Sequence, residues 1–182
     1  MTNETYLEGC RRELGRLRRL AERALAQVSD EAFFASTGPE SNSAAVIVKH
    51  VSGNMLSRWQ GFLSSDGEAG RDRDAEFVIT GADTREALER QWNQGWDTLF
   101  DVLGSLGESD LDRVVLVRRE PHSVLQAIQR QLVHYACHVG QIVYVARLTA
   151  GENWQCLSIP KGQSAAVNER PGNYLGAGGP AR

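Results

Sequence analysis

The sequence predicts an all-α protein: a four-helix bundle in residues 1–150, followed by a C-terminal extension in residues 151–182. Four segments place apolar residues at steps of three and four, the spacing that lines one face of an α-helix. The chain has 182 residues, of which 41% are hydrophobic and 24% are charged. This composition suits one globular domain with a substantial core, and four amphipathic helices in such a chain favour a bundle.

The first two helices are expected over about residues 3–28 and 43–63, where the apolar stripes run. Ser43 stands where its hydroxyl can accept a hydrogen bond from an unpaired backbone N–H at the start of the second helix. Between the two helices, residues 29–42 contain a Gly-Pro pair and small polar residues. We therefore expect a loop there.

The third and fourth helices carry start signals of their own. Asp83 followed by Glu86 resembles a capping box, and the apolar residues after it recur as far as Leu106. Pro121 suits the first turn of the fourth helix, because the N–H that proline lacks would have no partner there. That helix is expected to extend to about Thr149.

Two short stretches outside the helices have other patterns. Residues 114–117 read VVLV, and such β-branched density favours a strand. Residues 77–79 form an apolar break in a polar, Gly-rich segment, and we expect the two stretches to pair as a short β ribbon. In the extension, the residues expected to anchor a segment on the bundle are Trp154, Leu157 and Ile159. Residues 168–182 are expected to be an irregular, mobile tail.

Composition argues against several classes of protein. The formal net charge of -3 gives no general attraction to nucleic acid or to anionic lipid. Three scattered cysteines do not form a disulfide framework. The N-terminus lacks the apolar core of a signal peptide, and no stretch reaches the roughly 20 apolar residues that span a bilayer. We expect a cytoplasmic protein that acts on a small molecule and binds neither nucleic acid nor membranes.

Three of the four histidines can be brought together. His134 and His138 are separated by one helical turn, so they share a face and can bind one metal ion as neutral imidazoles. His50 lies at the border of the apolar face of the second helix. His122, at the expected start of the fourth helix, points to a different side of that helix from His134. Three imidazoles leave a coordination position for water or substrate, which is the catalytic pattern. The alternative is a set of partly buried histidines that bond to backbone or carboxylates.

Several neighbours of these histidines are candidates for supporting roles. Asn54 and Gln141 each follow a candidate ligand by one turn, so they can contact the ligands or a substrate, or they can be ordinary buried amides. Arg58 and Arg130 can hold a substrate carboxylate, or can bridge loops at the surface. We expect Cys137 to be a small buried hydrophobic residue and not a ligand.

Two segments resemble the histidine motifs of the DinB superfamily, the damage-inducible, YfiT-like four-helix proteins. Residues 43–59, SAAVIVKHVSGNMLSRW, resemble the first histidine motif, and residues 127–147, AIQRQLVHYACHVGQIVYVAR, resemble the motif of the last helix. Residues 158–168, SIPKGQSAAVN, are similar to the tail of an uncharacterised branch. The resemblance spans nearly the whole chain, in the expected order.

The resemblance implies a bundle of DinB type, commonly a homodimer, with a divalent metal such as zinc or nickel on His50, His134 and His138. Some members of the superfamily are S-transferases that use a low-molecular-weight thiol: bacillithiol, mycothiol or glutathione. Others are thiol-dependent isomerases. We therefore expect a metal-dependent thiol S-transferase acting on a small electrophile. The alternative is a non-catalytic metal- or ligand-binding bundle in a stress response, and a third reading makes the histidines purely structural.

Overall fold

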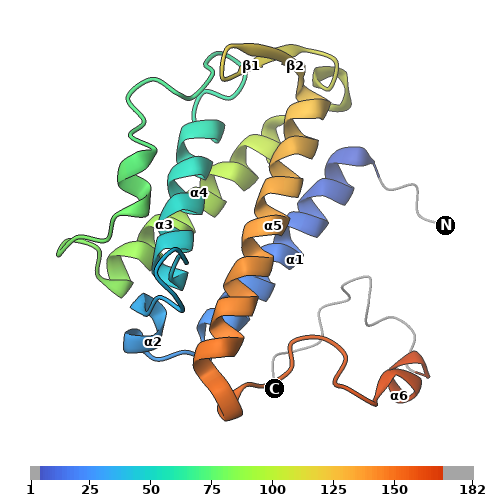
Figure 1. The fold of residues 1–182 in the computed structure, drawn as a ribbon. Coiled ribbons are helices and arrows are strands. Elements are labelled where there is room, and N and C mark those ends of the chain that lie inside the picture. The colour runs from blue at the N-terminus through green and yellow to red at the C-terminus, as the bar shows by residue number, and fades with distance from the viewer. Residues whose placement is uncertain (1–4, 170–182) are drawn as a thin grey trace.

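The computed structural model describes residues 5–169, and this part of the chain is mainly helical (Figure 1). It contains six α-helices and one two-stranded antiparallel sheet. In chain order these elements are α1 (Tyr6–Leu25), α2 (Asp30–Phe34), α3 (Ala44–Trp59), α4 (Arg85–Ser105), β1 (Val114–Val117), β2 (Glu120–Ser123), α5 (Val124–Ala150) and α6 (Ser164–Asn168). The prediction of a mainly helical chain is confirmed. Within residues 5–169, no helix combines the length and the apolar character that crossing a membrane requires.

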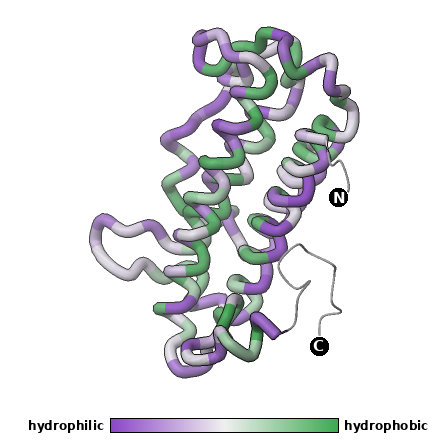
Figure 2. The backbone as a smooth tube through the Cα atoms, turned by 90° about the vertical axis from the view of Figure 1, so that its right-hand side faces the viewer, coloured by the Kyte–Doolittle hydropathy of each residue, from purple (hydrophilic) through white to green (hydrophobic). Residues whose placement is uncertain are grey.

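The four long helices lie side by side around a shared core. α1 packs on α5 and touches α4, whereas α3 packs on both α4 and α5 (Figure 1). Hydrophobic and hydrophilic residues alternate along these helices (Figure 2), as amphipathic helices require. α3 is the exception, since most of its residues are buried. Polar side chains on α3 are therefore enclosed by protein and need partners there.

Side-chain caps fix where the helices begin, and two of them differ from the predicted starts. α3 starts after Ser43, as predicted, with the Ser43 hydroxyl accepting from the Val46 N–H at 3.2 Å. α4 is capped by Thr84 and not by Asp83, because the Asp83 carboxylate instead accepts from the Lys49 ammonium and the Thr80 N–H.

The predicted place of Pro121 in the first turn of the last helix is wrong. A capping box between Ser123 and Gln126 starts α5 at Val124, three residues after Pro121, and Pro121 lies in β2 opposite Leu116. The strand predicted at residues 114–117 is confirmed, but its predicted partner, residues 77–79, is wrong. β2 follows β1 after a two-residue turn, so pairing with β2 closes a much shorter loop and costs less chain entropy.

Two further segments differ from the prediction. The expected loop at residues 29–42 contains α2, which Ser29 caps and which buries Phe33. α3 ends at Trp59, because the chain turns at Gly61, where φ is +65°. The expected start of the first helix at Asn3 and most of the expected mobile tail lie outside the described residues. In the extension, the residues that pack on the core are Trp154 and Leu157, whereas Ile159 is exposed.

The turn between β1 and β2 carries backbone strain. Arg118 and Arg119 have φ values of +52° and +67°, as a type I′ turn requires at both central positions. Asn and Gly are the usual residues there, because a side chain in this region costs about 1–2 kcal/mol per residue. The hairpin therefore keeps two arginines at positions where glycine is favoured.

We predict that Arg119→Gly raises the free energy of unfolding by about 0.5–1 kcal/mol, because the relief of left-handed strain exceeds the added chain entropy of glycine. Urea unfolding of the full chain measures the change. Arg119→Ala is the matched control, since it removes the same charge and retains the strain. A glycine variant no more stable than the alanine variant would contradict the prediction.

Candidate metal centre

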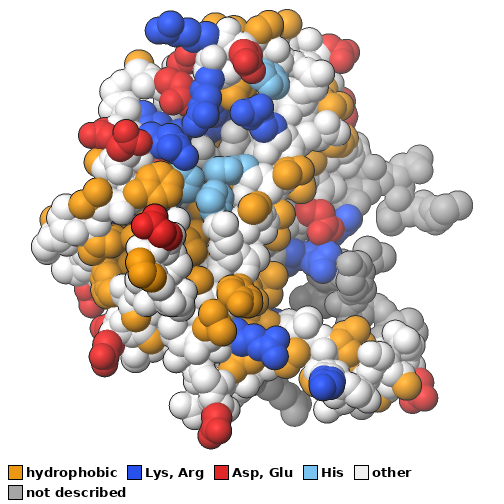
Figure 3. Space-filling model, viewed as in Figure 1, with side chains coloured by type: hydrophobic (Ala, Val, Ile, Leu, Met, Phe, Trp, Pro, Cys, Tyr) orange, Lys and Arg blue, Asp and Glu red, His pale blue; other side chains and the backbone are white. Residues whose placement is uncertain are grey.

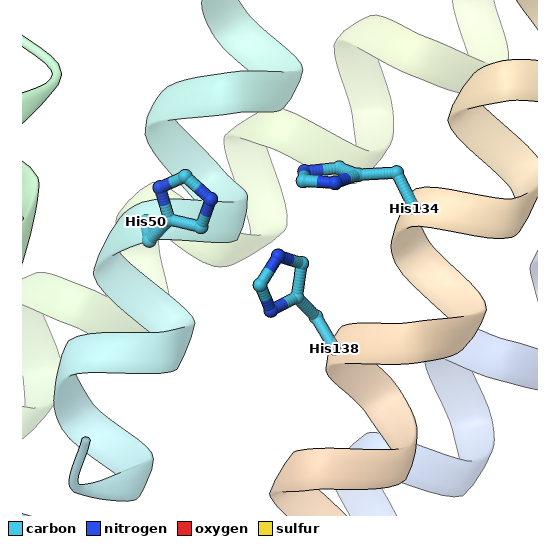
Figure 4. Close-up of side chains that lie close together, drawn as sticks. All are labelled: His50, His134 and His138. Atoms are coloured by element: carbon cyan, nitrogen blue, oxygen red, sulfur yellow. The ribbon is translucent and has the colours of Figure 1, made fainter. Parts of the chain in front are cut away.

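Three imidazoles converge between α3 and α5 (Figure 4). His50 comes from the buried face of α3, while His134 and His138 come from successive turns of α5. One nitrogen of each ring can be chosen so that all three lie within 4.8 Å of one another. The ring centroids of His134 and His138 are 4.5 Å apart, and that of His50 is 4.9 Å from His138. The structure thus brings together the three histidines that the sequence singled out.

His50 is oriented by a buried carboxylate. Its Nδ1 lies 2.7 Å from Glu76 Oε2, and Arg71 donates to both oxygens of that carboxylate, at 2.8 and 2.9 Å. Burial alone raises the pKa of Glu76, but the hydrogen bonds from His50 and Arg71 outweigh it and hold the pKa below its ordinary value. A carboxylate acceptor keeps the proton on Nδ1, so Nε2 of His50 is free to bind a metal.

His138 and His134 each have a ring nitrogen available to bind a metal. Gln141 Oε1 lies 2.8 Å from His138 Nδ1 and so holds the proton there, leaving Nε2 free. His134 Nε2 is buried and has no hydrogen-bond partner in the described chain. Burial, and then the neighbouring imidazoles, lower the pKa of His134 from 6.5 to about 4, and burial also lowers that of His138. Neutral imidazoles are the form that binds metal.

A glycine makes the contact between Glu76 and His50 sterically available. Glu76 belongs to a short 3-10 helix, Asp74–Phe77, that packs on α3. A Cβ at Gly53, one turn after His50, would lie 2.6 Å from Glu76 Oε1. Gly53 therefore gives the carboxylate room to approach the helix. The ring of Phe77, from the same 3-10 helix, also packs against His50, with ring centroids 4.7 Å apart.

Sequence reasoning missed Glu76, Arg71 and Gly53. The first two lie in the irregular segment before α4, where no periodicity indicates which side chains face inward. The only available signal was Gly53, because an isolated glycine inside a helix often marks a close approach of another group.

A cavity of about 370 Å³ adjoins the histidines. His50 and His134 reach it, and the histidines are visible at the surface beside a group of basic side chains (Figure 3). Three of the four residues predicted to support the histidines also line it: Asn54, Arg58 and Arg130. Gln141 lies instead against His138.

A chain of hydrogen bonds fixes α3 relative to α5 at this cavity. Trp59 Nε1 donates to the Tyr135 hydroxyl at 3.0 Å, and that hydroxyl donates to Asn54 Oδ1, also at 3.0 Å. Tyr135 is fully buried. Asn54 thus has a structural partner as well as a place in the cavity wall.

Two residues near the histidines lie outside the cluster. Cys137 is exposed, so the prediction of a small buried hydrophobic residue is wrong. It lies on the outer face of α5, whereas α1 and α3 pack against other faces of that helix. His122 lies in β2, with Nδ1 3.0 Å from the Glu120 carbonyl oxygen.

The donor set fits a divalent metal ion. Two imidazoles have one nitrogen held by an acceptor and the other free, and the third has a buried nitrogen without a partner. Nitrogen ligands suit zinc and nickel, and a carboxylate behind a ligating histidine is the usual support for such a site. Three ligands next to a cavity form an open site, to which a further small molecule can bind.

Comparison with known proteins gives a family and no activity. Residues 1–163 match a family described as a protein of unknown function, DUF1572. This range includes the three histidines, Glu76 and every residue that lines the cavity. No curated protein matches the chain.

We predict that Gly53→Ala weakens metal binding about 10- to 100-fold, because the added methyl displaces Glu76 from His50 and such supporting contacts carry that weight. Competition with a chromophoric chelator measures the affinity. The matched control is Gly104→Ala in α4, where a Cβ meets nothing within 4 Å. The control should bind metal as the parent does, and equal affinities in all three proteins would count against the role of Glu76.

Proposed function

The chain belongs to the DUF1572 family, to which no activity is assigned, and we propose that it is a metal-dependent, thiol-using transferase of DinB type. The observation that carries this proposal is the convergence of His50, His134 and His138 beside an open cavity, with one buried ring nitrogen left without a partner. The arrangement of four long helices and the two histidine motifs support the DinB assignment.

Zinc and nickel are the metals that the donor set favours, since three imidazoles bind both well. When bound, a divalent ion lowers the pKa of a coordinated thiol, so that a thiolate forms near neutral pH. Glu76 keeps Nε2 of His50 available, and Gln141 does the same for His138.

The nucleophile is supplied by the cosubstrate in this proposal. The described residues that line the cavity include no cysteine, serine or threonine. A low-molecular-weight thiol would lose its proton to solvent, and its sulfur would bond to an electrophilic carbon as the leaving group departs with the electron pair. The protein then binds and orients both molecules without forming a covalent bond to either.

The first test is the metal content of untagged protein, measured by mass spectrometry. We predict about one equivalent of metal per chain, its loss in His134→Ala, and its retention in the control His122→Ala. Because the zinc site exists only in the folded state, zinc at 1,000 times its dissociation constant should raise the free energy of unfolding by about 4 kcal/mol. Protein that stays metal-free after reconstitution with zinc and with nickel would rule out the proposal.

The second test is turnover by the metal-loaded protein. We predict that it consumes a small electrophile together with bacillithiol, mycothiol or glutathione, and that His138→Ala loses at least about 100-fold in rate, as loss of an activated nucleophile implies. Cys137→Ser should leave the rate unchanged, because this exposed cysteine lies away from the cavity. Bound metal without turnover of any thiol would instead favour a non-catalytic stress-response protein.

A further inference from the structure

Five arginines line the cavity beside the three histidines: Arg58, Arg71, Arg73, Arg118 and Arg130. The chain has 20 basic residues and a net charge of -3, so a quarter of its basic residues gather at one cavity of a net acidic protein. No aspartate or glutamate is among the described lining residues. Such a concentration of guanidinium groups is the usual means of recognising carboxylate or phosphate.

Part of this charge has a structural role. Arg71 pairs with Glu76, and Arg58 donates to Glu68 Oε1 at 2.8 Å and to the Asp66 carbonyl oxygen. Glu68 is shared further, since Arg71 Nη1 and Arg118 Nε lie 3.7 and 3.8 Å from its Oε1. One carboxylate thus faces three guanidinium groups, and positive charge remains in excess.

Two of the five arginines make few contacts with other residues of the protein. Arg130 makes no hydrogen bond or ion pair with any residue in the range 5–169, and it is exposed. Arg118 approaches only the shared Glu68 and is about half exposed. It also sits at a strained position of the hairpin turn, with φ +52°. Strain of this kind at a cavity wall is typical of functional positions.

Unsatisfied polar atoms concentrate at the same place. Six buried side-chain nitrogen or oxygen atoms lack a hydrogen-bond partner in the described chain. Four of them belong to residues that line this cavity: Arg58 Nε, Arg71 Nη1, Gln131 Oε1 and His134 Nε2. Buried polar atoms generally have partners, so this cluster indicates where a polar ligand binds, and its two guanidinium nitrogens, Arg58 Nε and Arg71 Nη1, are donors suited to an anion.

The two helices place the arginines in line with the histidines. On α3, His50, Asn54 and Arg58 follow one another at four-residue steps, and all three line the cavity. On α5, Arg130 precedes His134 by one turn. These offsets correspond to about 6–12 Å along the helix axes, which is the length of a small molecule with several bonds.

We propose that the arginine-lined cavity binds an anionic group, a carboxylate or a phosphate, of a small molecule whose reactive end reaches the three histidines. Arg118 and Arg130 are the residues that contact this group, while Arg58 and Arg71 supply buried charge behind it. The inference rests on the proposed metal function, because it assigns the class of substrate to that same site.

The test is calorimetric titration of the full chain, zinc-loaded and metal-free, with malonate and with inorganic phosphate. Malonamide is the uncharged analogue of malonate. We expect malonate or phosphate to bind, malonamide to bind at least about tenfold more weakly, and higher salt to weaken anion binding. The preferred anion distinguishes a carboxylate substrate from a phosphate one.

Variants of the exposed arginines keep the fold intact and make the test specific. Arg118→Gln and Arg130→Gln should each weaken anion binding about tenfold or more, as loss of a charged hydrogen bond implies. Arg119→Gln is the matched control, because it removes the same charge from the same strained turn without lining the cavity. Glu68→Gln should strengthen binding, since it removes the carboxylate that competes for the same guanidinium groups.

The metal content of each sample separates the two proposals. If zinc is bound but anion affinity does not change in the Arg118 and Arg130 variants, or falls equally in the Arg119 variant, this inference alone is overturned. If no zinc is bound but anion affinity still falls in the Arg118 and Arg130 variants, the metal function is overturned and the anion site is supported. Equal affinity for malonate and malonamide would also overturn the inference.

Discussion

The geometry of the candidate metal centre depends on one buried carboxylate, that of Glu76. Removing a carboxylate from water costs several kcal/mol, which only close partners offset. Here His50 and Arg71 supply those partners, with three contacts between 2.7 and 2.9 Å. The contact with His50 sets the tautomer of that histidine and holds the segment before α4 against α3, while Arg71 fixes the carboxylate from within the segment. The orientation of a candidate metal ligand on a regular helix is thus decided by an irregular segment, and Gly53 gives that segment the space to approach.

This dependence explains which parts of the structure could be predicted. The long helices follow from apolar residues at helical spacing, and the His134–His138 pair follows from its four-residue separation. Glu76 and Arg71 lie in a segment without a repeating pattern of apolar residues, so only the three-dimensional structure shows that their side chains point inward. The exposed Cys137 shows a second limit. Helical spacing gives the angle between side chains on α5, but the faces that α1 and α3 cover are set by packing between helices.

Electrostatics link the histidines to the arginines. Because imidazole binds a metal in its neutral form, a divalent ion bound to the three histidines would keep its full charge, and Glu76 is already engaged by Arg71. Two unit charges 8 Å apart interact by about 2 kcal/mol at an effective dielectric constant of 20. A metal ion on the histidines and the guanidinium groups that line the same cavity would repel one another, and an anion between them would relieve that repulsion. A thiolate at the metal and a carboxylate or phosphate at the arginines would each supply the missing negative charge.

The strained turn between β1 and β2 places one of these guanidinium groups at the cavity. An Asn-Gly turn would close β1 onto β2 with less strain, but it would present no cation to the cavity wall that Arg118 lines. A β hairpin fixes the position of its turn through the register of its strands, and the pairing of Val117 with Glu120 holds Arg118 at the rim of the cavity. Because the backbone of Arg118 is already fixed there, a ligand would have to order only its side chain, which limits the entropy lost on binding. The backbone strain at Arg118 is then a local cost in stability that the fold tolerates in return for a positive charge at the cavity wall.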